Sequence, residues 1–197
     1  MDGRESAADL PGGRDAALEL LHEHTKKPGL IKHALAVEAA CRAYAEQRGA
    51  DADAWGLVGL LHDFDYERWP TPEDHPFRGV EILAGQGYPE WFRRAILSHA
   101  DYSGVARETP LEKTLFACDE LSGFLTACAL VTPARSLHDV KVKSVRKKMK
   151  SRGFAASVNR EDIVTGAADL GVELDDHIAF VLAALQRVAD SLELAGS

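Results

Sequence analysis

Histidine and aspartate residues fall on the inward-facing sides of four predicted helices. A buried imidazole or carboxylate is costly unless it is paired or coordinated, and one metal centre would satisfy several of them at once. His33 shares an apolar helix face with Leu30 and Val37, and Asp119 lies four residues after Leu115. The residues of this set are His33, His62, Asp63, His99 and Asp119. Their types and placement favour a metal centre over a set of unrelated core residues.

The adjacent pair His62–Asp63 ends the most apolar segment of the chain. Imidazole and carboxylate are both good ligands for divalent metals. In a helix interior, two successive side chains diverge by about 100°, but the backbone can turn at a helix end. The position of the pair therefore allows both side chains to converge on one ion.

Helical periodicity dominates the elements that must position these residues. We expect helices over residues 14–24, 30–48, 53–63, 77–86, 88–99, 110–131, 138–150, 159–170 and 174–194. Residues 64–76 hold three prolines and several acids and are expected to form a loop. Thr109-Pro110-Leu111-Glu112 combines a capping box with proline at the first helical position. Few stretches alternate with period two, so the predicted class is all-α.

Composition indicates a soluble, folded protein. The chain has 197 residues, of which 46% are hydrophobic and 27% charged, enough for one domain with a sizeable core. Its three cysteines have no CxxC spacing and are expected to be buried, reduced thiols. No signal peptide or membrane span is apparent, so we expect a cytoplasmic location. The net charge of −8 makes nucleic acid an unlikely partner for the chain as a whole.

The order of the ligands resembles that of the HD superfamily of metal-dependent phosphohydrolases. LLHDFD at residues 60–65 matches the central hydrophobic-His-Asp segment of that family, although Phe64-Asp65 replaces the Ile-Gly that often follows. The resemblance covers roughly residues 28–131 and implies His33, His62, Asp63 and Asp119 as ligands. It also implies an HD-domain helical bundle over 14–135. Residues 1–13 are polar and rich in Gly and Pro, so we expect them to form a flexible tail. Residues 136–197 would form a C-terminal helical extension packed on that bundle.

His75 and His99 occupy the places where binuclear relatives, such as the HD-GYP phosphodiesterases, carry further histidines. By this resemblance they complete a second site, with Asp63 as the bridge and with Asp63 and Asp119 as catalytic carboxylates. One or two divalent ions of Mn, Fe, Co, Ni or Zn would be bound. Alternatively, His75 is a surface loop residue, and His99 a core residue or substrate contact. The GYP segment itself is absent, so cyclic dinucleotide hydrolysis does not follow.

Further segments resemble those of small bacterial proteins predicted to be HD hydrolases, although these supply no substrate. The segments are LLHDFDYE, HPFRGVEIL, ILSHA, LEKTLFACDELSGF and KSVRKKMKSRGFAASVNR.

A basic segment runs from Val140 to Arg160 without an Asp or Glu. One interpretation is a clamp for substrate phosphates, with Arg146, Lys147 and Lys148 as substrate-binding residues. A nucleic-acid contact and an ordinary solvated helix face are the alternatives, and the lack of interleaved aromatic residues disfavours single-strand binding.

The resulting hypothesis is hydrolysis of a phosphate ester or phosphoanhydride by a metal-activated water, on a nucleotide or another small phosphorylated metabolite. An HD-type di-iron oxygenase related to inositol oxygenase and a non-catalytic HD binding module are the alternatives. Asp65 could contact a metal-bound water, and Glu120 could contact the metal ligands without binding the metal itself. The chain would be a monomer or a homodimer. Surface positions are expected for His22, His24, His138 and His177.

Overall fold

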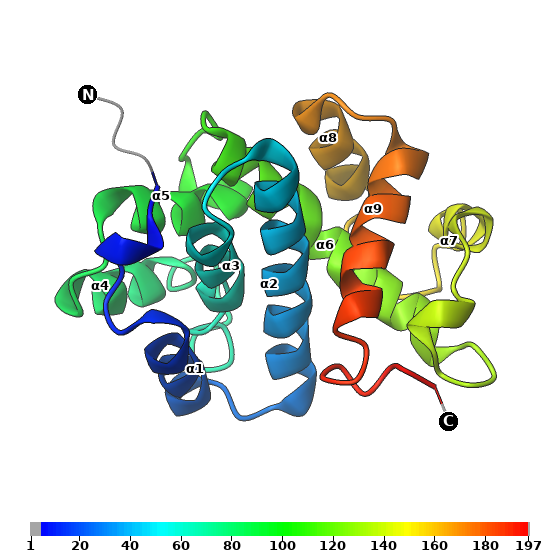
Figure 1. Cartoon of the computed structure of the whole chain (residues 1–197), viewed down its shortest axis with the longest axis horizontal. Helices are drawn as coiled ribbons and strands as arrows, with labels where there is room; N and C mark the ends of the chain where they lie inside the picture. The colour runs from blue at the N-terminus through cyan, green and yellow to red at the C-terminus, as the bar shows by residue number, and fades with distance from the viewer. Residues whose placement is uncertain (1–4, 197) are drawn as a thin grey trace.

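The structure is a computed structural model that describes residues 5–196, and in these residues it contains nine α-helices and no β-strand (Figure 1). The predicted all-α class is confirmed. Three short 3-10 helices cover Ala7–Asp9, Asp101–Ser103 and Leu137–Asp139. The α-helices are α1 (Gly13–His24), α2 (Pro28–Arg48), α3 (Ala52–Leu61), α4 (Phe77–Gly85), α5 (Glu90–His99), α6 (Pro110–Leu130), α7 (Val142–Met149), α8 (Arg160–Leu170) and α9 (Leu174–Arg187).

Side-chain caps fix the starts of three of the helices around the site, α3, α6 and α8. Thr109 and Glu112 form the predicted capping box at the start of α6. Asn159 caps α8 by accepting a hydrogen bond from the backbone N–H of Glu161. Asp51 caps α3 in the same manner, and its other carboxylate oxygen accepts from the N–H of Ala7 at 2.9 Å.

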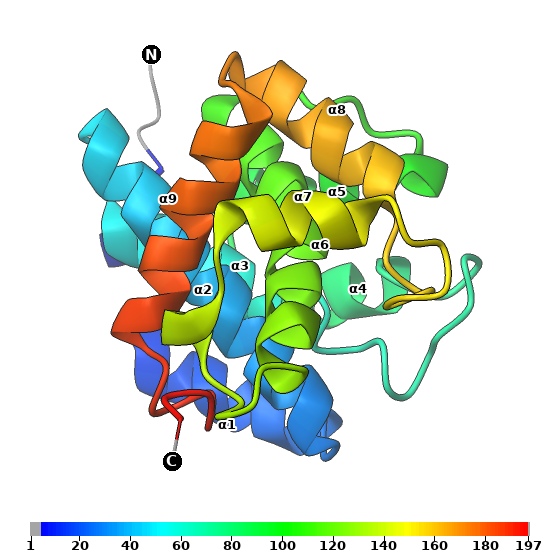
Figure 2. The ribbon, with the colours of Figure 1, turned by 90° about the vertical axis from the view of Figure 1, so that its right-hand side faces the viewer.

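The centre of the fold is α3 held between its neighbours, with α2 and α6 as the two long helices beside it (Figures 1 and 2). A side chain at Gly59 would place its Cβ 2.8 Å from the carbonyl oxygen of Val37, so glycine lets α3 approach the backbone of α2. A Cβ added at Gly166 of α8 would likewise lie 2.5 Å from the Cα of Ala117 in α6, so glycine also lets these two helices pack closely. These two close approaches bring α2, α3, α6 and α8 into one compact group.

The N-terminal segment differs from the loose tail expected for residues 1–13. Residues 1–4 lie outside the described part of the chain, but residues 5–12 pack against α3. Leu10 is buried, and the indole N–H of Trp55 donates to the carboxylate of Glu5 at 2.7 Å. Apolar contact and this hydrogen bond hold a stretch whose Gly and Pro content had suggested disorder.

The C-terminal extension differs from the prediction in two places. The helix expected over 138–150 begins only at Val142, after the short 3-10 turn. The last helix ends at Arg187 instead of residue 194, because the chain turns back and the carbonyl of Leu194 accepts a hydrogen bond from the N–H of Leu137 at 2.8 Å. Leu192 is buried by this return. The domain boundary at 135/136 stays a prediction.

The apolar face of α9 packs on α2 and α6 of its own chain through buried Ile178, Val181 and Leu185. The surface positions predicted for two histidines are wrong. His177 is fully buried and hydrogen-bonds the Tyr44 hydroxyl at 2.6 Å. His24 is also buried, with its ring edge-on to a phenylalanine.

All three cysteines are buried and free, as expected. In the described part of the chain, no helix has both the length and the apolar character that crossing a membrane requires.

Candidate metal centre

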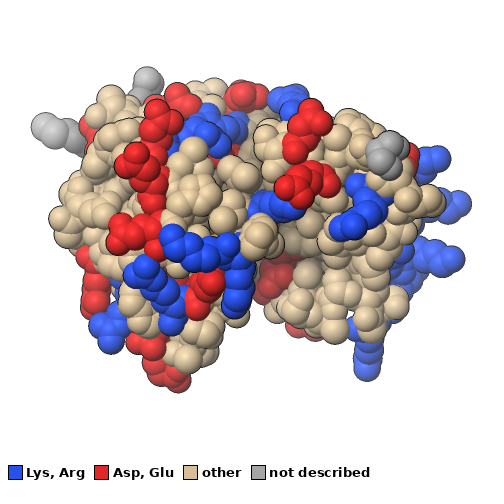
Figure 3. All heavy atoms as spheres, turned by 90° about the horizontal axis from the view of Figure 1, so that it is seen from below, with Lys and Arg blue, Asp and Glu red and all other residues tan. Residues whose placement is uncertain are grey.

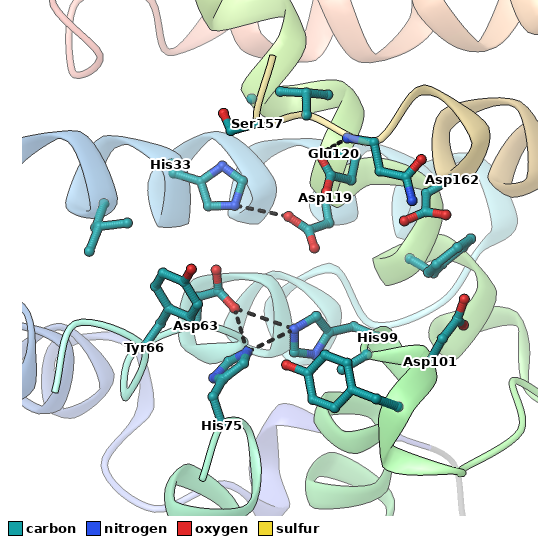
Figure 4. Close-up of a pocket in the computed structure, with 17 residues that line it drawn as sticks. His33, Asp63, Tyr66, His75, His99, Asp101, Asp119, Glu120, Ser157 and Asp162 are labelled. Carbon is teal, nitrogen blue, oxygen red and sulfur yellow. Dashed lines mark hydrogen bonds and ion pairs between the residues drawn. The ribbon is translucent and has the colours of Figure 1, made fainter. Parts of the chain in front are cut away.

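Five of the six side chains predicted as ligands line one pocket (Figure 4), and the sixth, His62, is fully buried next to Asp119. The six residues come from five separate segments of the chain. His33 lies in the second turn of α2, His62 and Asp63 follow the end of α3, and Asp119 lies in the middle of α6. His99 is the last residue of α5, and His75 ends the loop before α4. The helix-end pair His62–Asp63 directs both side chains to this cluster, although His62 falls in one ligand group and Asp63 in the other.

His33, His62 and Asp119 form one group whose ligand atoms lie within 4.8 Å of one another. Nε2 of His33 is 2.9 Å from Oδ1 of Asp119, and Nε2 of His62 is 3.4 Å from the same oxygen. His62 is fully buried, and its Nε2 makes no hydrogen bond of normal geometry in the described structure. A wholly buried nitrogen without a partner, facing a carboxylate and a second imidazole, fits a metal ligand.

Asp63, His75 and His99 form the second group. Oδ1 of Asp63 is 3.2 Å from Nε2 of His75 and 3.3 Å from Nε2 of His99. The other carboxylate oxygen of Asp63 is 3.5 Å from Nε2 of His62, which belongs to the first group. Asp63 thus presents one oxygen to each group, the placement that a bridging carboxylate requires.

Hydrogen bonds at Nδ1 leave Nε2 of three histidines free to face the centre. Nδ1 of His62 lies 2.8 Å from the carbonyl of Gly59, and Nδ1 of His99 lies 2.5 Å from that of Ile96. A carbonyl can only accept, so Nδ1 carries the proton in the neutral form of each imidazole, and Nε2 then offers its lone pair to a metal ion. Such partners orient a metal-ligating histidine and fix its tautomer.

Asp65 holds His75 in the same way, through a carboxylate. Oδ1 of Asp65 lies 2.8 Å from Nδ1 of His75, and Oδ2 accepts a hydrogen bond from the N–H of Gly79 at 2.8 Å. The Asp65 side chain is 1% exposed. The sequence analysis considered Asp65 only as a contact to a metal-bound water. Its position two residues after Asp63 in an acidic loop gave no sign of burial.

The electrostatics of the cluster are those of opposed charges held close together. Burial alone would lower the pKa of His62, but the nearby charges of Asp63 and Asp119 raise it to about 10. Likewise, Asp63 and Asp65 outweigh burial at His75 and raise its pKa to about 9. Burial would raise the pKa of Asp63 and Asp119, but the histidines hold both well below the usual aspartate value. The carboxylates are therefore ionised and attract positive charge, whether protons or metal ions.

The pocket above the cluster has a volume of about 510 Å³. Its walls include Tyr66, Tyr102 and Phe116, together with Asp101, Glu120, Ser157, Asn159 and Asp162. The segment carrying Ser157 is fixed by Arg160, whose guanidinium donates hydrogen bonds to the carbonyls of Phe154, Ala155 and Val158.

Glu120 lines this pocket next to Asp119 and accepts a hydrogen bond from the N–H of Asn159 at 3.1 Å. Burial and then the neighbouring Asp119 charge raise the pKa of Glu120 to about 7. Sequence reasoning considered Glu120 as a support for the ligands, but it missed Asn159 and Asp162 as pocket residues. Nothing in the sequence signals that α8 packs on α6 and brings its N-terminal end to the pocket.

The basic residues predicted as a phosphate clamp are not brought to the pocket. Arg146, Lys147 and Lys148 are all absent from its lining. Instead, Nε of Arg146 pairs with Asp175 at 3.0 Å, and the Lys148 ammonium lies 4.7 Å from the centre of the Phe154 ring. Figure 3 shows Lys and Arg side chains projecting from the edge of the molecule on which α7 lies in Figure 1. The three side chains therefore do not meet at the pocket in this structure.

Comparison with known proteins supports the superfamily expected from the ligand series. Residues 30–123, just under half of the chain, match the model of the HD domain family. The matched segment contains all six candidate ligands. HD domains are all-α and are mostly metal-dependent hydrolases. No curated protein and no solved structure shows a significant match to the chain.

Proposed function

We propose that this protein is a metal-dependent phosphohydrolase that cleaves a phosphate ester or phosphoanhydride of a small molecule. The observation that carries the proposal is the convergence of two His/Asp groups at the base of one pocket. His33, His62 and Asp119 would hold one ion, and Asp63, His75 and His99 a second. Asp63 would bridge the two through its two oxygens.

Divalent ions bound in these groups would supply positive charge for phosphoryl oxygens and would lower the pKa of a water molecule towards neutrality. In the reaction, a water oxygen bonds to phosphorus, the phosphorus–oxygen bond to the leaving group breaks, and the leaving oxygen takes up a proton. Asp63 and Asp119, each about one-fifth exposed, would accept a hydrogen bond from that water.

The surrounding residues orient these groups. The carbonyls of Gly59 and Ile96 and the carboxylate of Asp65 keep Nε2 of three histidines directed at the centre. Tyr66 stacks edge-on against the His75 ring at 5.2 Å between ring centres and covers one side of the second group.

The first experiment is the metal content of protein purified without chelator, followed by phosphate release from a panel of phosphorylated small molecules after loading with Mn²⁺. We expect close to two ions per chain and measurable release. His62→Ala and Asp119→Ala should each abolish release. His138→Ala is the matched control, because this exposed histidine lies outside the pocket.

Two results would contradict the proposal. Iron content with dioxygen consumption and no phosphate release would indicate an oxygenase. Activity that survives both His62→Ala and Asp119→Ala would show that the assigned centre does not carry the reaction.

A further inference from the structure

Apart from the histidines of the metal centre, the charged side chains that line the pocket are all acidic within the described part of the chain. The lining contains Asp63, Asp101, Asp119, Glu120 and Asp162 and, among residues 5–196, no Lys or Arg. A pocket that met phosphate charge with side chains would present arginine or lysine, as is usual for phosphate recognition. In this pocket, the metal centre is therefore the group that would bind the negative charge of a phosphoryl group.

Three of these five carboxylates already have positive partners or a place in the centre. Asp63 and Asp119 belong to the two His/Asp groups. Asp101 pairs with the guanidinium of Arg107 at 2.5 Å, and that guanidinium also lies over the Phe116 ring. Arg107 is itself shared, because Asp169 lies 3.7 Å from its Nε.

Glu120 and Asp162 remain without an ion pair to Lys or Arg among the described residues. Both are partly buried, so water screens them incompletely. Figure 4 shows them together on one side of the pocket, across the ligand cluster from Tyr66. Asn159, between the segments that carry them, donates its backbone N–H to Glu120 and caps α8 with its side chain. The two carboxylates therefore sit on fixed backbone.

A second observation, independent of Glu120 and Asp162, points to a ligand at the metal cluster beneath this pocket. The fully buried Nε2 of His62 has no hydrogen-bond partner and faces Asp119, which lines the pocket. A ligand at the centre would place its remaining atoms in the 510 Å³ above it, alongside Glu120 and Asp162. The basic cluster of α7 does not balance these acids, because none of its side chains lines the pocket.

We propose that the substrate carries an ammonium group as well as a phosphoryl group, and that Glu120 and Asp162 bind the ammonium while the metal centre faces the phosphoryl group. The inference rests on the proposed function and narrows it to small zwitterionic phosphate esters. An ammonium donates charge-assisted hydrogen bonds to carboxylates. An anionic group in the same place would be repelled by both acids.

The test compares three phosphate esters of similar size on Mn²⁺-loaded protein. They are O-phosphoethanolamine, with an ammonium; 2-hydroxyethyl phosphate, which is neutral at that position; and phosphoglycolate, with a carboxylate. Binding is measured by calorimetry and phosphate release by a colorimetric assay. One charge-assisted hydrogen bond corresponds to about 10- to 100-fold in affinity, so the ammonium ester should bind at least about 10-fold more tightly than the neutral one. Phosphoglycolate should bind most weakly.

Variants then assign the preference to the two carboxylates. In Glu120→Gln/Asp162→Asn, the ratio of affinities for the ammonium and neutral esters should fall to within about 3-fold of unity, as expected once the charge-assisted bonds are lost. Glu161→Gln is the matched control, because it removes a neighbouring exposed carboxylate that does not line the pocket and should leave the ratio unchanged. The wild-type comparison decides the question even if the double variant does not fold.

The outcomes separate this inference from the proposed function. Equal or tighter binding of the neutral or anionic ester, or binding of none of the three, would overturn the inference. So would a third metal ion per chain in the wild type that the double variant lacks, since the acids would then bind a further metal. An ammonium preference without phosphate release would support the inference and refute the hydrolase. Phosphate release without an ammonium preference would support the hydrolase and refute the inference.

Discussion

Asp65→Asn tests the most specific feature of the candidate centre, the carboxylate behind His75. Asp65 accepts two hydrogen bonds, one from Nδ1 of His75 and one from the N–H of Gly79. Asparagine has one acceptor oxygen and one NH₂ donor, so it can satisfy only one of these donors. If its oxygen stays with Gly79, its NH₂ faces His75. The imidazole must then accept at Nδ1 and carry its proton on Nε2, the atom that faces Asp63.

The expected effect is a selective loss of metal affinity. Replacing the partner behind a metal-bound histidine typically costs about 10- to 100-fold in affinity, and a charge-assisted hydrogen bond of about 1.5–3 kcal/mol accounts for a loss of that size. We expect this loss in the Asp63–His75–His99 group only, because Asp65 makes no contact with His33 or Asp119 that would transmit it. The variant should therefore retain close to one ion per chain under conditions in which the wild type retains two.

The assay is equilibrium dialysis of the chelator-treated protein against a series of Mn²⁺ concentrations, followed by elemental analysis, with circular dichroism to confirm that the variant is folded. Asp74→Asn is the matched control. It changes a carboxylate next to His75 that pairs only with Thr71 and Arg78 at the surface. The reasoning would be refuted if Asp65→Asn bound both ions as the wild type does, if it lost both, or if Asp74→Asn lost the same ion.

Three further predictions concern stability. Mn²⁺ at about 100 times the Kd of both sites should stabilise chelator-treated protein by about 5 kcal/mol, or about 2.7 kcal/mol per ion, which raises Tm by about 10–20 °C in calorimetry; a rise as large in His62→Ala would contradict the assigned centre. Gly59→Ala should cost about 1–3 kcal/mol in urea unfolding, because its Cβ would lie 2.8 Å from the Val37 carbonyl, whereas Gly29→Ala, with nothing within 4 Å, should not destabilise. Burial lowers the pKa of His177 below its unfolded value near 6.5, so the unfolded chain takes up a proton first as the pH falls. Between pH 7.5 and 5.5 the wild type in EDTA should lose up to about 1.4 kcal/mol more stability than His177→Gln, and equal losses would refute this assignment.

The helices and the ligand set were predictable because each has a local signature. The capping box at Thr109, the apolar stripes and the His-Asp pair at a helix end are all read from neighbouring residues. The burial of His177 depends instead on where α9 packs, since its partners are Tyr44 and the carbonyl of Ala117. Such long-range contacts leave no periodic pattern in the sequence.

The walls of the pocket were harder to foresee than its base. Asn159 was predicted as a helix cap, and the structure confirms this, but its place beside Glu120 follows from the packing of α8 on α6. The sequence analysis predicted that the basic residues of α7 bind substrate phosphates, because their charge pattern is conspicuous. Charge density along a sequence does not say which way a helix faces, and Arg146 turns to Asp175 instead.

The two His/Asp groups differ in how much of the chain each needs. Asp63, His75 and His99 lie within one stretch of the chain that ends at residue 99, whereas the group of His33 and His62 is completed only by Asp119. During synthesis, Asp63, His75 and His99 leave the ribosome before α6 has been made. The group that contains Asp119 can assemble only after α6 has emerged and docked against α2. If both groups bind metal, the group of Asp63, His75 and His99 would be the one whose ligands are all synthesised first.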